Sequence, residues 1–207
     1  MNGRAERPSR YDAPHPVTAA DARAAAFLTF ITYLRIALTP VVMALVLNAD
    51  RWSPAIPTAA VLFAFAALTD FFDGRLARRW KQTTTLGNFL DTTADKLLVS
   101  GVLIALVEVG RASAWAAFVI VGRELVIMGL RGAVSAADGT VVEPSVWGKL
   151  KANVQFLAVF LAIWQPDIMV GSWRLDQVVM AVAAVVTIAS GVEYLARFGG
   201  VLVRRER

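Results

Sequence analysis

Six long apolar stretches, joined by short polar segments, constrain the fold of this chain more than any other feature. They cover residues 27–47, 55–72, 86–109, 115–133, 146–164 and 175–195. An α-helix needs about 20 apolar residues to cross the hydrocarbon core of a bilayer. With 57% hydrophobic residues among 207, the chain is also far more apolar than a soluble domain of this length. The pattern predicts an all-α, polytopic membrane protein built as a bundle of six transmembrane helices.

The basic residues are distributed unevenly among the segments that join these stretches. If the amino terminus is cytoplasmic, fifteen lysines and arginines fall on the cytoplasmic side and only Arg51, Arg111 and Arg174 on the other. Cytoplasmic loops of membrane proteins carry such an excess of positive charge. We therefore expect cytoplasmic N- and C-termini. We interpret the net charge of +5 as a sign of topology and expect no nucleic-acid partner.

The stretches leave room for one domain with two tails. Residues 1–22 are polar, contain three prolines and lack the apolar core of a signal peptide, so we expect a mobile cytoplasmic tail there. Residues 23–198 are expected to form the membrane domain, and residues 199–207 a basic C-terminal tail. The chain has no cysteine, which excludes disulfides and thiolate metal sites.

Four aspartates lie at the predicted cytoplasmic ends of the second and third stretches: Asp70, Asp73, Asp91 and Asp95. Spacings of three and four residues place both members of each pair on one face of a helix. If the two helices pack as an antiparallel hairpin, the pairs converge, and four uncompensated carboxylates would repel one another at the membrane boundary. Ligand sets made only of oxygen suit Mg²⁺ or Mn²⁺, which commonly also bind phosphate oxygens. The pattern predicts a divalent cation site used in phosphate chemistry.

Two other interpretations of the aspartates stay open. They can be helix-end charges that are solvated or paired with Arg75, Arg78 and Lys96. They can also belong to a divalent cation carrier, which would place its acids along a path across the bilayer. The four aspartates instead cluster at one membrane face beside Gly74 and Ala77, whose small size lets a ligand approach the helix backbone. This placement favours a phosphate-bearing ligand.

The stretch from Asp70 to Asp95 reads D-x2-D-G-x2-A-R-x8-G-x3-D-x3-D. It resembles the signature of the CDP-alcohol phosphatidyltransferase family at every fixed position. Further segments are similar to the phosphatidylglycerophosphate synthases of that family: Val121-Gly-Arg-Glu-Leu125, Gly148-Lys-Leu-Lys151 with Gln155, Ser190-Gly191 with Tyr194, and Thr32-x2-Arg35 with Pro40. The resemblance implies transfer of a phosphatidyl group from CDP-diacylglycerol to glycerol 3-phosphate, with release of CMP.

Two other acceptors within the family remain open, because Ala26, Thr29 and Ala152 depart from the usual pattern. The chain could be a cardiolipin synthase, which uses phosphatidylglycerol, or a phosphatidylinositol phosphate synthase. The family resemblance and the absence of an organelle-targeting signal indicate the inner, cytoplasmic membrane of a bacterium, with the active site facing the cytoplasm. Small residues in the predicted helices would permit a homodimer.

The resemblance also implies roles for individual residues. One or two divalent ions, Mg²⁺ or Mn²⁺, would be ligated by Asp70, Asp73 and Asp91, while Asp95 lies near the ions and serves as the catalytic general base. The residues expected to bind the CDP-lipid are Thr69, Asp70, Gly74, Ala77 and Arg78.

The phosphate of the acceptor needs cations from the later stretches. We favour Arg123, Lys149 and Lys151, with Arg131 as a further candidate. Glu124 follows Arg123 directly, and because successive helical residues point in different directions it cannot be assumed to pair with it.

Overall fold

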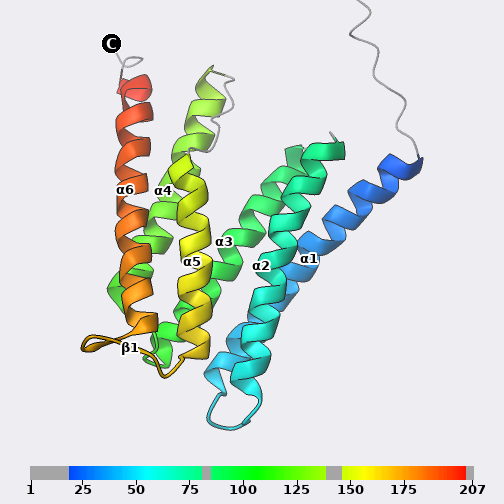
Figure 1. The fold of residues 1–207 in the computed structure, drawn as a ribbon. Helices are drawn as coiled ribbons and strands as arrows, with labels where there is room; N and C mark the ends of the chain where they lie inside the picture. The colour runs from blue at the N-terminus through cyan, green and yellow to red at the C-terminus, as the bar shows by residue number, and fades with distance from the viewer. Residues whose placement is uncertain (1–18, 81–84, 139–145, 204–207) are drawn as a thin grey trace, which may run out of the picture.

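The computed structural model describes residues 19–80, 85–138 and 146–203, and these form six α-helices and one short β-hairpin (Figure 1). The bounds of the elements are α1 Ala19–Leu47, α2 Ala55–Trp80, α3 Thr85–Glu108, α4 Ala114–Asp138, α5 Val146–Trp164, β1 Met169–Val170, β2 Trp173–Arg174 and α6 Leu175–Val203. Each predicted apolar stretch lies within one helix or differs from it by one residue at an end. The prediction of an all-α bundle is therefore confirmed.

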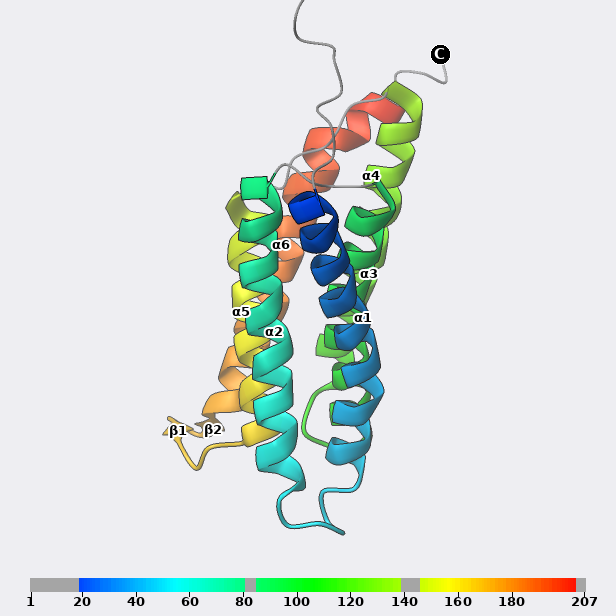
Figure 2. The ribbon, with the colours of Figure 1, turned by 90° about the vertical axis from the view of Figure 1, so that its right-hand side faces the viewer.

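Successive helices run in opposite directions, which gives the bundle two distinct ends (Figures 1 and 2). Helix α1 packs against α2 and α3, and α6 packs against α4 and α5. The two groups are joined by contacts of α5 with α2 and α3 and by contacts between α3 and α4. The lower end in Figure 1 carries the β-hairpin, and the upper end carries the end of α2 and the start of α3.

Helices α2 and α3 are antiparallel, as expected, but they do not form a closely packed pair within the described residues. Both pack mainly against α1. The close contact of α3 with α1 includes Gly101 of α3, where a Cβ atom would lie 2.9 Å from Thr39 Cγ2 and from Met43 Sδ. A glycine is needed for α1 to approach α3 this closely. The convergence of the two aspartate pairs across an α2–α3 hairpin therefore stays a prediction.

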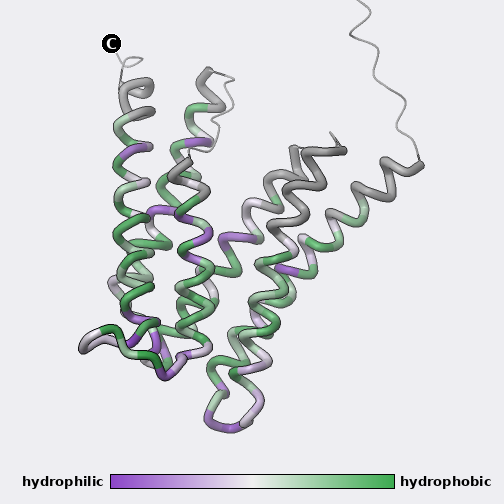
Figure 3. Tube along the Cα trace, in the orientation of Figure 1, coloured by the Kyte–Doolittle hydropathy of each residue, from purple (hydrophilic) through white to green (hydrophobic). Residues whose placement is uncertain are grey.

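The apolar core lies where α1, α2, α3 and α5 meet, and α4 and α6 add a few residues to it. Phe63 of α2 is buried there, with its ring centroid 6.1 Å from that of Phe156 in α5. Figure 3 shows apolar residues along most of each helix, with hydrophilic residues in the lower turns and at one level further up in α3, α4 and α5. The polar level is therefore separated from the lower end by apolar packing.

Many large apolar side chains face outward from the helices. Phe118 is 70% exposed, and Val61 and Val185 are each 65% exposed. Two segments of the described chain, Thr29–Leu47 and Leu175–Ala196, are long and apolar enough to cross a membrane by length and composition. An apolar surface of this kind suits lipid as the surrounding solvent.

The described helices extend beyond the predicted domain at both ends. Helix α1 begins at Ala19, so residues 19–22 are helical, although we expected them to belong to the tail. Helix α6 ends at Val203 and includes residues 199–203, which were assigned to the C-terminal tail. The rest of both tails lies outside the described residues. The β-hairpin before α6 was not predicted, because its strands are only two residues each.

Candidate active site

The residues of the predicted metal and CDP-lipid sites lie on two helices near the upper end of the bundle. Asp70, Asp73, Gly74, Ala77 and Arg78 belong to the last turns of α2, and Asp91 to the first turns of α3. The side chains of these residues lie outside the described part of the structure. Their predicted roles therefore rest on the sequence and on the placement of the two helices.

Thr69 is the predicted CDP-lipid ligand whose side chain is described. Its hydroxyl donates a hydrogen bond to the carbonyl oxygen of Ala66, one turn earlier in α2, at 2.8 Å. The proton of the hydroxyl is therefore used by the helix itself. Only the acceptor capacity of the oxygen remains for a ligand.

Asp95, the predicted general base, lies in α3 with about a quarter of its side chain exposed. Its Oδ2 atom forms an ion pair with Lys96 Nζ at 3.6 Å. Its Oδ1 atom is buried and has no hydrogen-bond partner within the described residues. A buried carboxylate oxygen without a partner costs free energy unless a cation or a donor completes it. Oδ1 is therefore the atom of Asp95 available to a metal ion or to an acceptor hydroxyl.

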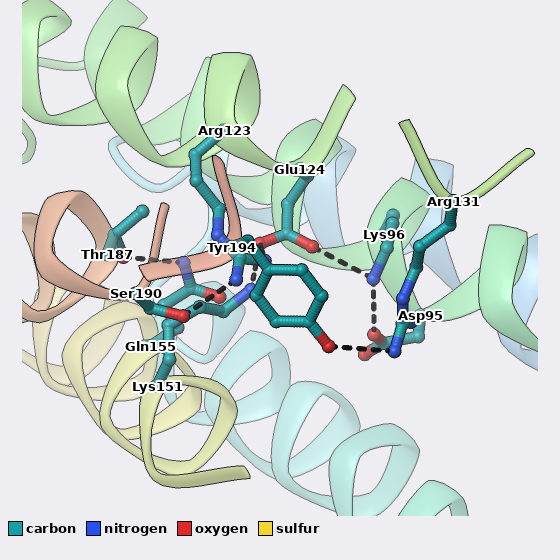
Figure 4. A network of polar contacts seen from close by, with 10 residues as sticks. All are labelled: Asp95, Lys96, Arg123, Glu124, Arg131, Lys151, Gln155, Thr187, Ser190 and Tyr194. Atoms are coloured by element: carbon teal, nitrogen blue, oxygen red, sulfur yellow. Dashed lines mark hydrogen bonds and ion pairs between the residues drawn. The ribbon is translucent and has the colours of Figure 1, made fainter. Parts of the chain in front are cut away.

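Glu124 of α4 is the centre of the polar cluster drawn in Figure 4. Its carboxylate is buried, and it contacts cations from three helices (Figure 4). Oε2 lies 2.9 Å from Lys96 Nζ of α3, and Oε1 accepts a hydrogen bond from Lys151 Nζ of α5. Oε1 also lies 3.4 Å from Nη1 of Arg123. The pairing of adjacent Arg123 and Glu124, which the sequence did not allow us to assume, is thus present, because both long side chains bend toward the same point.

Arg123 is fixed by the last helix as well as by Glu124. Its Nη2 atom donates a hydrogen bond to the hydroxyl of Ser190 in α6 at 2.7 Å. A Cβ atom on Gly191 would lie 3.2 Å from Arg123 Cγ, so the glycine leaves room for the aliphatic part of the arginine. The Nε atom of Arg123 is buried without a hydrogen-bond partner within the described residues. A donor is therefore left for a ligand.

Tyr194 of α6 lies between the two arginines of α4 (Figure 4). Nη2 of Arg131 donates a hydrogen bond to the Tyr194 hydroxyl at 3.0 Å. The guanidinium carbons of Arg123 and Arg131 each lie 5.5 Å from the centroid of the Tyr194 ring, within the range of cation–π attraction. The ring is buried, and it holds both guanidinium groups near one another.

The structure brings together three of the four predicted acceptor cations and places them in the same polar cluster as Asp95. Arg123, Arg131 and Lys151 all belong to the cluster in Figure 4. Lys149 lies in α5, two residues before Lys151, and its side chain is outside the described residues. Within the cluster four cations surround two carboxylates, so a dianionic phosphate group would be electrostatically favoured there.

Sequence reasoning missed the two residues that connect this cluster. Lys96 was considered only as a partner for the aspartates, and Glu124 was given no role. Both have a signal in the sequence, since each is a charged residue inside a stretch that is expected to cross the membrane. Gln155 is also placed here, with its amide nitrogen donating to the Thr187 hydroxyl at 2.9 Å.

The family model for CDP-alcohol phosphatidyltransferases matches residues 28–189, which is most of the chain and includes part or all of each helix. The chain belongs to this family. The match covers the stretch from Asp70 to Asp95 and the cluster residues on α3, α4 and α5. Ser190, Gly191 and Tyr194 lie within the five residues that follow it.

Curated relatives give the same assignment. The chain is 39% identical over 178 residues to the CDP-diacylglycerol--glycerol-3-phosphate 3-phosphatidyltransferase of Bacillus subtilis, covering 81% of this chain and 92% of the relative. Proteins of that name from Pectobacterium atrosepticum and Salmonella choleraesuis are 36% and 35% identical, covering 81% and 84% of this chain and 91% and 96% of the relatives. The chain is therefore a transferase of this family, and its apolar helices make it a membrane protein.

The metal ion that we expect in this phosphatidyltransferase fits the chemistry of the donor set. Oδ1 of Asp95, which is buried without a hydrogen-bond partner in the described part of the chain, is the kind of oxygen that a hard cation binds. Within the described residues no group of three or more acidic, histidine or cysteine side chains forms a metal site. The other predicted ligands, Asp70, Asp73 and Asp91, have side chains outside that part.

Proposed function

We propose that this protein transfers the phosphatidyl group of CDP-diacylglycerol to glycerol 3-phosphate, giving phosphatidylglycerol phosphate and CMP in phospholipid biosynthesis. The observation that carries the proposal is the position of Asp95 beside a cluster of cations, within a chain of this family. The names of the relatives support the choice of both substrates. An acceptor with a hydroxyl and a phosphate group would fit such a neighbourhood, since one group needs a base and the other needs cations.

Asp95 acts as the general base in this proposal. Its Oδ1 accepts the proton of the primary hydroxyl of glycerol 3-phosphate as the hydroxyl oxygen attacks the phosphorus of the phosphatidyl group. The new phosphorus–oxygen bond forms as the bond to CMP breaks, and CMP leaves with the electron pair. The ion pair of Oδ2 with Lys96 leaves Oδ1 as the oxygen that faces the acceptor.

Asp70, Asp73, Asp91 and Asp95 would hold one or two Mg²⁺ or Mn²⁺ ions. The bound ions would neutralise charge on the diphosphate of the CDP-lipid and so make CMP a better leaving group. The lipid itself would be bound along the end of α2 by Thr69, Asp70, Gly74, Ala77 and Arg78. The small residues at positions 74 and 77 would let the nucleotide lie against the helix backbone.

The acceptor phosphate would be bound by Arg123, Lys149 and Lys151, with Arg131 as a further cation. Support comes from the buried Nε of Arg123, which has no hydrogen-bond partner within the described chain. Planar guanidinium groups bind phosphate oxygens in pairs, and lysines add point charges. Binding the acceptor by its phosphate would orient the distant hydroxyl toward Asp95.

The topology that we propose has six transmembrane helices, both termini in the cytoplasm and the active site facing the cytoplasm, in the inner membrane of a bacterium. The uneven distribution of lysine and arginine and the outward-facing apolar side chains support it. Because the chain lacks cysteine, Ser113→Cys provides a single label in the exposed lower turn between α3 and α4. A thiol reagent that does not cross membranes should label it only from the outer side, and labelling only from the cytoplasmic side would overturn the topology. A homodimer in the membrane is part of the proposal as well.

The activity is tested by CMP release from the purified protein with CDP-diacylglycerol and Mg²⁺. Glycerol 3-phosphate, phosphatidylglycerol and inositol phosphate are offered in separate reactions. We expect release with glycerol 3-phosphate alone. Release only with another acceptor would overturn the substrate but keep the family chemistry, and no release with any acceptor would favour a cation carrier.

A further inference from the structure

Glu124 is the one carboxylate of the cluster in Figure 4 that contacts more than one cation. Its two oxygens are used in different directions. Oε1 faces Lys151 and Arg123, which are candidates for binding the acceptor phosphate. Oε2 faces Lys96, whose ammonium group reaches Asp95 on its other side. Glu124 thus stands between the predicted phosphate site and the predicted base.

The electrostatic environment gives the carboxylate a large influence on its neighbours. Lys151 is 5% exposed and Glu124 is also 5% exposed, so their charges are little screened by solvent. Without Glu124, the ammonium groups of Lys96 and Lys151 and the guanidinium of Arg123 would face one another with no carboxylate between them. Each would then turn toward water or another acid, and Asp95 Oδ2 already lies 3.6 Å from Lys96 Nζ.

We propose that Glu124 is a positioning residue for the phosphatidyl transfer, which holds Lys151 and Arg123 as a phosphate-binding pair and, through Lys96, turns Oδ1 of Asp95 toward the acceptor. The inference rests on the proposed function and deepens it. One buried carboxylate then aligns both ends of the acceptor, the phosphate and the reacting hydroxyl. Alignment of this kind lowers the barrier to transfer, because the hydroxyl is already placed for attack.

A purely structural counter-ion would need fewer contacts than these. A single pair with Lys151 would suffice to stabilise a buried ammonium group. Glu124 instead joins α3, α4 and α5, and Oε2 is directed to Lys96, whose side chain is 24% exposed. A partly exposed lysine has water available to it and does not require a buried partner. The contact with Lys96 therefore points to a role for the pair beyond neutralising a buried charge.

The test compares steady-state kinetics of wild-type protein with Glu124→Gln, which keeps the shape of the side chain and removes its charge. We expect the KM for glycerol 3-phosphate to rise about tenfold or more and kcat to fall, because three charge-assisted contacts are weakened. The KM for CDP-diacylglycerol should stay within about twofold, since the lipid is bound elsewhere. Glu124→Asp should restore part of the loss. The matched control is Glu108→Gln, an exposed carboxylate at the lower end of α3, which should leave all three constants unchanged.

Two further variants separate the contact of Glu124 that leads to Asp95 from its contact with Lys151. Lys96→Met should lower kcat more than it raises the KM for glycerol 3-phosphate, because it removes the contact with Asp95 and leaves the contacts of Glu124 with Lys151 and Arg123 in place. Glu124→Gln combined with Lys151→Met should raise this KM by less than the product of the two single effects, as expected for residues that act through one another. If Glu124→Gln does not fold, Lys96→Met and Glu124→Asp carry the test.

The inference is overturned if the KM of Glu124→Gln for glycerol 3-phosphate stays at the wild-type value. This holds even if the variant has a changed thermal unfolding midpoint or a lower kcat. It is also overturned if the effects of Glu124→Gln and Lys151→Met multiply independently. Wild-type turnover with glycerol 3-phosphate is measured first. A failure of the proposed function can then be told apart from a failure of this inference alone. Lack of wild-type turnover with any phosphate-bearing acceptor would overturn the proposed function and this inference together.

Discussion

Two regions of the helix bundle, the lower region and the polar level above it, are stabilised by different interactions. Below the polar level, Phe63, Phe156 and their aliphatic neighbours fill the space between helices. At the polar level, ion pairs and hydrogen bonds around Glu124 and Arg123 replace this packing. Apolar side chains need no polar partner, whereas the polar cluster retains buried atoms of Asp95 and Arg123 without hydrogen-bond partners in the described chain. The comparison teaches that the lower region depends on apolar contacts, whereas the polar level carries the charged groups that we propose bind the acceptor.

The strongest test of this comparison is Asp95→Asn. We expect kcat to fall about 10²–10⁴-fold, because an amide cannot accept the proton of the acceptor hydroxyl. Binding of the CDP-lipid, measured by equilibrium dialysis with a labelled substrate, should change little. If turnover persists within about tenfold of wild type, Asp95 is not the base.

Phe63→Ala probes the lower region. Loss of a buried aromatic ring should destabilise the fold by about 3 kcal/mol through the cavity that it leaves, and the thermal unfolding midpoint in detergent should fall. At a temperature where the variant is folded, the KM values of both substrates should equal those of wild type. A changed acceptor KM would show that the lower region and the polar level are coupled and would break the comparison.

Lys151→Met probes the polar level in the same way. Removing one charge-assisted contact should raise the KM for glycerol 3-phosphate about 10- to 100-fold, with the KM for CDP-diacylglycerol unchanged. The measurement is CMP release at varied acceptor concentration. Arg51→Met, which removes an exposed cation at the lower end, is the control and should leave the acceptor KM unchanged. Equal effects of both variants would indicate loss of net charge rather than of a binding contact.

The smallest effect is expected from Gly191→Ala. The added Cβ would meet Arg123 Cγ at 3.2 Å, so the arginine must move by a few tenths of an ångström. We expect the acceptor KM to rise about two- to fivefold, by analogy with other small displacements of binding groups. Gly122→Ala is the matched control, because a Cβ at that position would meet no atom within 4 Å beyond its chain neighbours and its own helix backbone. An increase of the same size in the control would contradict the role assigned to Gly191.

The positions of the helices were predictable because hydrophobicity is a local property. Length and apolar content alone located the helix over residues 146–164 at its observed bounds, Val146–Trp164. The end of α1 at Leu47 and the starts of α2 at Ala55 and α6 at Leu175 were also predicted. The packing of α1 against both α2 and α3 was not, because it depends on the fit of Gly101 against Thr39 and Met43, residues far apart in the sequence.

By itself the sequence determined the class of fold and the family, and it identified the charged residues from which the candidate site is drawn. Spacing along a helix is enough to recognise the aspartate motif, because its members lie within two adjacent segments of the chain. Only the tertiary structure decided how the cations are used. Lys96, Glu124 and Lys151 come from three helices, and which of them meet depends on how those helices pack. Glu124 also pairs with its neighbour Arg123, because two long side chains can bend toward a common point that backbone directions alone do not reveal.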